Sequence, residues 1–107
     1  MMNKLFVYGT LQEKTIQIEL TNRFQEGEVD SISGFKVLRD YFVDDDYYPR
    51  LVEQSDGLVY GRVLEFSDDE IYIIDEYESE MYTRQFMETN KGDVVEVYMP
   101  VLNPQIV

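Results

Sequence analysis

The sequence predicts a single α+β domain spanning residues 1–107. Three observations predict this class: a short apolar run near the N-terminus, further β-favouring runs along the chain, and a helix-capping signature at Ser67. A chain of 107 residues with 44% hydrophobic residues can bury one core. No internal repeat, low-complexity segment or linker divides it, so we expect one domain.

The first third of the chain predicts a strand followed by a helix. Leu5–Tyr8 is apolar and β-favouring, and it stops at Gly9, which is typical of a buried strand that ends in a tight turn. Lys14–Phe24 mixes two hydrophobic periods, but it contains neither Gly nor Pro. We therefore predict a helix there.

The middle of the chain predicts extended structure. In Gly27–Val43 a Ser-Gly pair and an Arg-Asp pair interrupt the β-favouring residues, so we expect two extended segments joined by turns or bulges. The acidic run Asp44–Asp46 and the following Tyr47–Pro49 predict a surface loop. Gly57–Phe66 is the strongest strand signal, and Gly61 within it predicts a bend or a close backbone approach.

The last third predicts a helix and a hairpin. Ser67 and Glu70 have the spacing of a capping box, so a helix should begin there. Arg84–Thr89 and Val94–Pro100 favour strands, and Asn90–Asp93 between them suits a hairpin turn. We expect the residues after Pro100 to form a tail.

The composition of the chain argues against several kinds of partner and chemistry. With 22 acidic and 9 basic residues the net charge is -13, which repels nucleic acid. Because Cys and His are both absent, we expect no disulfide, thiolate nucleophile or zinc–sulfur site, and any acid–base chemistry must use carboxylates, Tyr or Lys. The apolar run at the N-terminus is too short for a signal peptide or a membrane span, so we expect a cytoplasmic protein without a membrane partner.

Glu78 is the candidate general base. At about 100° per residue it falls on the apolar half of the predicted helix, whereas Tyr72 and Glu76 fall on the other half. The residues that share its half are Ile71, Ile73, Ile74 and Tyr77. Burial and the negative end of the helix would both raise its pKa, as a carboxylate base requires. The alternative is an exposed acid at a helix end, and we interpret neighbouring Asp75 as structural, bonded to backbone or to Arg84.

The turn Tyr8–Leu11 is the second candidate feature. Gly9 would let the backbone approach a ligand closely, and successive amides can bind an anion. Neither phosphate-loop nor dinucleotide spacing occurs, so the turn predicts a site for a carboxylate or an oxyanion rather than a nucleotide. The alternative is that it only reverses the chain.

Six short motifs follow one another along the chain in the order in which they occur in a known family. The motifs are Leu5–Leu11, Tyr48-Pro49-x-Leu51, Gly57-x-Val59-Tyr60-Gly61-x-Val63, Ile74–Glu78, Tyr82-x-Arg84 and Val97-Tyr98. With these motifs the chain resembles the γ-glutamylcyclotransferase-like, or avirulence-induced-gene-like, family over residues 5–98.

The resemblance implies a small mixed β-barrel with flanking helices and a cavity at one face. It also implies that Glu78 is the catalytic base, that Tyr8, Gly9, Thr10 and Leu11 bind the substrate, and that Tyr82 and Arg84 line or brace the cavity. The implied reaction is attack of the α-amine of a γ-glutamyl group on its own side-chain carbonyl, which releases 5-oxoproline and a free amine. It requires no metal or cofactor.

The sequence leaves open the substrate, the class of function and the oligomeric state. Gln12–Thr15 stands where the family often has basic residues and glycine, which together with the net charge favours a γ-glutamyl amine over an anionic γ-glutamyl peptide. The alternative function is a non-catalytic module that binds a small anion or a partner protein on the same fold. A third reading is a protein whose acidic surface binds a basic partner; the oligomeric state is not predicted.

Overall fold

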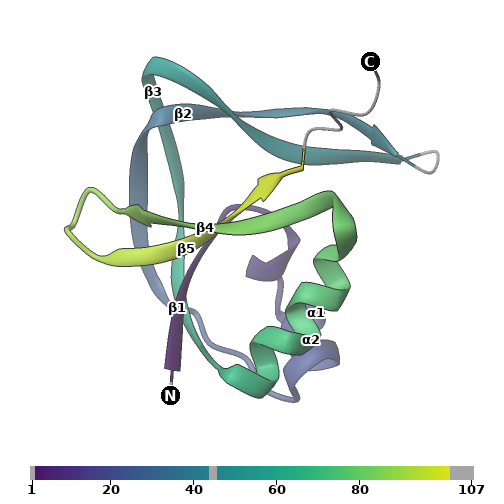
Figure 1. The fold of residues 1–107 in the computed structure, drawn as a ribbon. Helices are drawn as coiled ribbons and strands as arrows, with labels where there is room; N and C mark the ends of the chain where they lie inside the picture. The colour runs from purple at the N-terminus through teal and green to yellow at the C-terminus, as the bar shows by residue number, and fades with distance from the viewer. Residues whose placement is uncertain (1, 44–45, 102–107) are drawn as a thin grey trace.

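The computed structural model describes residues 2–43 and 46–101. The strands are β1 (Met2–Val7), β2 (Glu28–Val43), β3 (Asp46–Ser67), β4 (Tyr82–Glu88) and β5 (Val94–Pro100). The helices are α1 (Lys14–Thr21) and α2 (Asp68–Glu78), with short 3-10 turns η1 (Thr10–Gln12) and η2 (Ser79–Met81). Figure 1 shows their arrangement.

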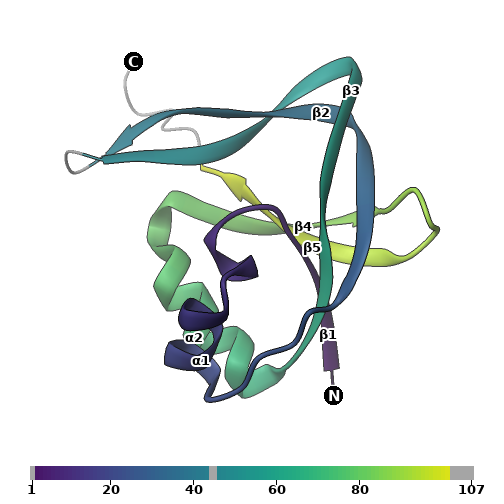
Figure 2. The same ribbon diagram turned by 180° about the vertical axis from the view of Figure 1, so that it is seen from behind.

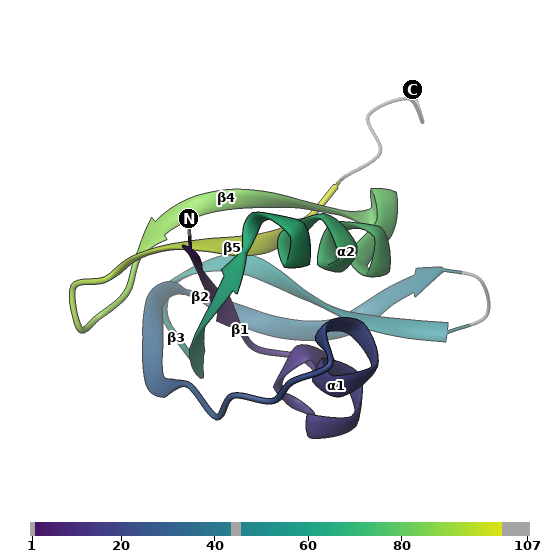
Figure 3. The ribbon, with the colours of Figure 1, turned by 90° about the horizontal axis from the view of Figure 1, so that it is seen from below.

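The strands form one mixed sheet in the order β2-β3-β1-β5-β4, in which only the β1–β5 pair is parallel among the described strands. The sheet curls into a half-barrel, and α1 and α2 lie side by side next to β1 (Figures 1 and 2). Viewed from below, the two helices lie on the same side of the curled sheet (Figure 3). The predicted α+β fold with a small mixed barrel and flanking helices is confirmed.

Two expectations for the middle of the chain were wrong. Gly27–Val43 does not contain two separate segments: β2 is one strand of 16 residues, and the interruptions appear as register shifts between Ser33 and Phe35 and between Leu38 and Tyr41. A bulge absorbs an extra residue without ending the pairing. Residues 46–49 belong to β3, where they pair with β2, rather than to a loop. Asp44 and Asp45 of that predicted loop, and most of the predicted tail, lie outside the described residues.

The turn between β4 and β5 bridges to the edge strand β2. The Asn90 amide donates to the Ser31 carbonyl at 2.8 Å, and the Lys91 amide donates to the buried carboxylate of Asp30 at 3.3 Å. Burial raises the pKa of Asp30, but hydrogen bonds from Thr89 and from backbone amides outweigh it, so this pKa lies below its ordinary value. These bonds tie the two ends of the half-barrel together.

Both faces of the second half of β1 are buried, because the side chains of Leu5, Phe6 and Val7 alternate between two cores. One core lies under the helices and contains Leu5, Val7, Leu11, Leu64, Phe66, Ile71, Ile74 and Tyr98. The other lies inside the half-barrel and contains Phe6, Ile32, Leu51, Val59, Val63, Val95 and Val97. The predicted close approach at Gly61 is confirmed, since a Cβ there would clash with the Val7 carbonyl oxygen and the Phe6 ring.

The helix α2 starts as predicted. Ser67 caps it, with the Glu70 amide donating to the Ser67 hydroxyl at 3.2 Å and the Ser67 amide donating to the Glu70 carboxylate at 2.9 Å. The first helix ends at Thr21, earlier than the predicted Phe24, because Asn22 adopts a left-handed conformation with φ of 61°. No helix within residues 2–43 and 46–101 is long and apolar enough to cross a membrane.

Candidate active site

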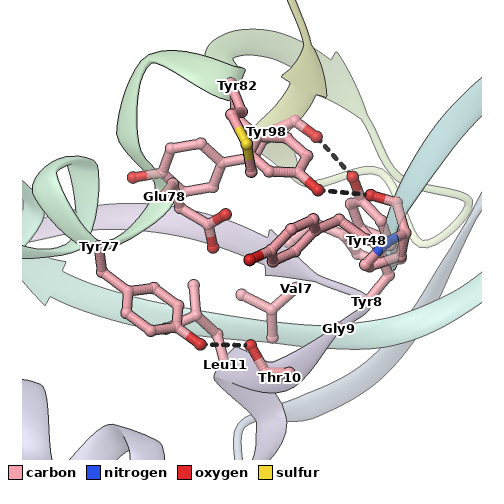
Figure 4. Close-up of a pocket in the computed structure, with 13 residues that line it drawn as sticks. Val7, Tyr8, Gly9, Thr10, Leu11, Tyr48, Tyr77, Glu78, Tyr82 and Tyr98 are labelled. Carbon is pink, nitrogen blue, oxygen red and sulfur yellow. Dashed lines mark hydrogen bonds between the residues drawn. The ribbon is translucent and has the colours of Figure 1, made fainter. Parts of the chain in front are cut away.

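A pocket of about 280 Å³ opens where the end of β1, the end of α2 and three other strands meet (Figure 4). Its volume is near the lower end of the roughly 300–1,000 Å³ typical of small-molecule sites. It is lined by Phe6, Val7, Tyr8, Gly9, Thr10, Leu11, Tyr48, Pro49, Tyr77, Glu78, Met81, Tyr82 and Tyr98.

The turn after β1 forms one wall of the pocket. The Gln12 amide donates to the Gly9 carbonyl at 3.1 Å and the Glu13 amide to the Thr10 carbonyl at 2.9 Å, which closes the η1 turn. Within the described part of the chain, no acceptor is found for the amides of Gly9, Thr10 and Leu11. A Cβ on Gly9 would make an ordinary 3.5 Å contact with Pro49, and its φ of -130° suits any residue. Glycine is therefore not required here by backbone conformation.

Buried contacts hold this turn in place. Leu11 is buried in the core under the helices, and its carbonyl accepts a 2.8 Å hydrogen bond from the side chain of Gln17 on α1. Gln17 is itself buried, and its side-chain oxygen accepts from the Gln25 amide at 2.9 Å. The Thr10 hydroxyl lies 2.7 Å from the Tyr77 hydroxyl, so the turn is also joined to α2.

Glu78 is the last residue of α2, and its half-buried carboxylate points into the pocket (Figure 4). Burial, followed by the negative charge of Asp75, raises the pKa of Glu78 from 4.5 to about 7. No hydrogen bond to this carboxylate is found among the described residues. The carboxylate is therefore accessible to a bound molecule and near its titration midpoint at neutral pH.

The apolar side of α2 is narrower than predicted. Ile71 and Ile74 are buried, but Ile73 and Tyr77 are each 40% exposed, so their predicted place on the buried side was wrong. The helix contacts the core only along a narrow stripe, and Ile73 lies beyond its edge. Glu78 lies one turn after Ile74 on that stripe, which is why it faces the pocket while Glu76 is exposed.

Asp75 is structural, as predicted, and its partner is Arg84. The Arg84 guanidinium donates two hydrogen bonds to the Asp75 carboxylate, at 2.9 and 3.0 Å, and a third to Glu96 at 2.7 Å. The Tyr98 hydroxyl donates to the same Asp75 carboxylate at 2.6 Å. Burial, and then the hydrogen bond to Asp75, raises the pKa of Tyr98, so this phenol remains a hydrogen-bond donor.

Tyrosine hydroxyls join the remaining walls. Tyr8 donates to the Tyr98 carbonyl at 2.7 Å, and Tyr82 donates to the Pro49 carbonyl at 2.7 Å (Figure 4). Burial, followed by the charges of Tyr82 and Glu78, raises the pKa of Tyr8, which stays protonated. The pocket thus combines one carboxylate with five tyrosine side chains.

Six of the seven candidate residues meet at this pocket: Tyr8, Gly9, Thr10, Leu11, Glu78 and Tyr82. Arg84 is not among the lining residues and contacts the site through Asp75. Lining residues that were not singled out are Phe6, Val7, Tyr48, Pro49, Tyr77, Met81 and Tyr98. All of them except Met81 lie in the motifs that carry the family resemblance, and those motifs were the available signal. No group of three metal-binding side chains is found in the described ranges.

Comparison with known proteins identifies relatives of this site. Residues 5–106 match the family described as "Gamma-glutamyl cyclotransferase, AIG2-like". AIG2-like protein C of Arabidopsis thaliana is 36% identical over 93 residues, covering 86% of this chain and 52% of that protein. AIG2-like protein B of the same plant is 32% identical over the same extent.

Solved structures share the fold. A solution structure of an Arabidopsis thaliana protein has a TM-score of 0.77 at 24% identity, covering 94% of this chain and 63% of that one. A structure named gamma-glutamyl cyclotransferase has a TM-score of 0.65 at 19% identity, covering 94% and 68%. The chain spans about half the length of the curated relatives it matches. By its sequence match over nearly its whole length, the chain belongs to the γ-glutamyl cyclotransferase, AIG2-like family.

Proposed function

We propose that this protein is a γ-glutamyl cyclotransferase in which Glu78 is the general base. The observation that carries the proposal is the Glu78 carboxylate, with a pKa raised to about 7, pointing into a pocket whose opposite wall is the Tyr8–Leu11 turn. A base is most effective when its pKa lies near the working pH. The family match supports the same reaction class.

The proposed reaction breaks one amide bond and forms another. The α-amino nitrogen of the γ-glutamyl group attacks the carbon of its own side-chain carbonyl, and Glu78 accepts the proton that this nitrogen loses. The tetrahedral intermediate collapses as the bond to the leaving nitrogen breaks, and Glu78 returns the proton to that nitrogen. The products are 5-oxoproline and a free amine, and the base ends the cycle ionised as it began.

The enzyme's main task in this reaction is to fix a reactive conformer. Nucleophile and electrophile belong to one molecule, so the pocket needs to hold the glutamyl chain in a bent conformation while it stabilises the oxyanion. We assign the substrate carboxylate and the oxyanion to the amides of Gly9, Thr10 and Leu11, which have no acceptor within the described chain. Tyr82 supports the wall that carries Pro49.

A γ-glutamyl amine suits the pocket better than an anionic γ-glutamyl peptide. None of the described residues lining the pocket is a Lys or Arg, and the chain has a net charge of -13. A second carboxylate on the leaving side would therefore meet repulsion with no paired cation. We propose an amine leaving group that is neutral or positively charged.

The test is release of 5-oxoproline from a panel of γ-glutamyl amines and γ-glutamyl dipeptides. Wild-type protein should release it, and Glu78→Gln should lose at least about a hundredfold in kcat/KM, the usual contribution of a general base. Glu76→Gln is the matched control, because it removes an exposed carboxylate from the same helix. Ligand-induced thermal stabilisation without any 5-oxoproline would instead support a binding module. An equally active Glu78→Gln would refute the assignment of the base.

A further inference from the structure

A hydrogen-bonded cluster of Asp75, Arg84, Glu96 and Tyr98 lies beside Glu78, and of these four residues only Tyr98 lines the pocket. Asp75 lies three residues before Glu78, so the two side chains occupy neighbouring positions on one helix face. Asp75 opens instead onto an adjoining polar crevice, together with Ser79, Arg84 and Glu96. Asp75, Arg84 and Glu96 therefore adjoin the base without lining the pocket where substrate would bind.

Two strands, β4 and β5, hold the Asp75 carboxylate. Arg84 on β4 binds it through Nε at 2.9 Å and through Nη2 at 3.0 Å, in the two-pronged geometry that a guanidinium makes with a carboxylate. Tyr98 on β5 donates at 2.6 Å to the oxygen that Arg84 Nε also binds. Arg84 is fixed in turn by Glu96 at 2.7 Å. The last turn of α2 is thus attached to the β4–β5 hairpin by a part-buried network.

The same network reaches the opposite wall of the pocket. The Tyr98 carbonyl accepts the hydrogen bond from Tyr8, the first residue of the turn that we assign to substrate binding. Tyr98 therefore links Asp75, through its hydroxyl, to Tyr8, through its backbone carbonyl. Movement of Asp75 would change the position of Glu78 relative to that turn.

We propose that Asp75, clamped by Arg84 and Tyr98, is a positioning residue that fixes the last turn of α2 and sets the electrostatic environment of Glu78. Its kinetic consequence rests on the proposed cyclotransferase function. Asp75 contacts no substrate, and Arg84 acts only through Asp75. Arg84 was expected to line or brace the cavity. It does not line the pocket, and we assign it the bracing role, through Asp75.

The charges around Glu78 make the proposal specific. The other titratable side chains that line the pocket around it are Tyr8 after β1, Tyr48 on β3, Tyr77 on α2, Tyr82 on β4 and Tyr98 on β5. Asp75 is the charged group that raises the Glu78 pKa, and its partner Arg84 carries the opposite charge. Removing the charge of Asp75 should lower the pH midpoint of Glu78 titration, and removing the charge of Arg84 should raise it.

The experiment measures the titration of Glu78 directly and through activity. Carbon-13 NMR of glutamate-labelled, substrate-free protein follows the Glu78 carboxyl, which is identified by its loss in Glu78→Gln. Asp75→Asn should lower the midpoint by on the order of one pH unit, since it removes a like charge one helical turn away. Arg84→Gln and the milder Tyr98→Phe leave that charge with fewer partners and should raise it. The acidic limb of the kcat/KM profile should move with each midpoint.

Matched controls separate this role from general destabilisation. Glu76→Gln removes a carboxylate from the exposed side of α2, and Arg23→Gln removes the arginine that binds Glu70 at the other end of the helix. Both should leave the midpoint and the pH profile unchanged. Midpoints that stay at the wild-type value in Asp75→Asn and Arg84→Gln, or that move in the same direction, overturn the proposal. Expected shifts in a protein that releases no 5-oxoproline would refute the proposed function and leave the electrostatic role intact.

Discussion

The buried carboxylate of Glu78 should make the folded protein less stable as the pH rises. Its pKa is 4.5 in an exposed setting and about 7 in the folded protein, so the folded state binds the proton more tightly. Stability from this group is therefore fully present below pH 4.5 and is lost as the pH rises through about 7. At about 1.4 kcal/mol per pH unit, the loss amounts to at most about 3 kcal/mol.

The variant Glu78→Gln isolates this effect. Glutamine has nearly the same shape but no charge to desolvate, so the variant should gain stability over wild type with increasing pH. The gain should be close to its minimum near pH 4.5 and larger by up to about 3 kcal/mol at pH 8, which is a large share of the stability of a small domain. A loss of activity would accompany it.

Urea unfolding of both proteins at several pH values between 4.5 and 8 measures this difference. The other acidic groups titrate equally in the two proteins, so they cancel in the comparison. Glu76→Gln, which removes an exposed carboxylate from the same helix, should show a difference that is independent of pH. A flat difference for Glu78→Gln would mean that Glu78 is solvated in the folded state and that our account of the base is wrong.

Three further predictions concern backbone conformation at Ser79, strand packing at Gly61 and helix capping at Ser67. Ser79 has φ of 64° and ψ of -168°, a region that suits glycine, so Ser79→Gly should be more stable than Ser79→Ala by about 1 kcal/mol in urea unfolding. Gly61→Ala should lose at least about 2 kcal/mol or fail to fold, because its Cβ would clash with the Val7 carbonyl and Phe6, and a stable, active variant would contradict the observed strand packing. Ser67→Ala should lose about 1 kcal/mol of unfolding free energy with unchanged kcat, because it removes only the helix cap.

Local signals in the sequence predicted local structure well. The capping box at Ser67 and the hairpin turn near Gly92 depend on residues only a few positions apart, and both appear as expected. The long β2–β3 hairpin was not predicted, because residues with weak strand preference interrupt it and the pairing across the hairpin overrides them as bulges. Whether such an interruption ends a strand depends on the partner strand, which a local pattern does not contain.

The site was predicted only where its residues carry a local pattern. The turn from Tyr8 and the acid Glu78 could each be read from their neighbours in sequence. Tyr48 and Met81 reach the pocket through strand register and a 3-10 turn, which hydrophobic periodicity does not determine. The second cause of the raised Glu78 pKa was also missed, since we expected the helix end and the structure shows Asp75.

Two departures from ordinary helix chemistry adjoin each other at the end of α2. Glu78 places an acid on the apolar stripe, where burial opposes its charge, and Ser79 adopts a backbone conformation that favours glycine. Each of them costs stability at the helix terminus. Together they turn the chain sharply at the residue whose carboxylate points into the pocket, while Asp75 one turn earlier is held by Arg84 and Tyr98. A helix that ended with an apolar residue and a glycine would be more stable but would place no base in the pocket, so the instability of this segment is what the proposed chemistry requires.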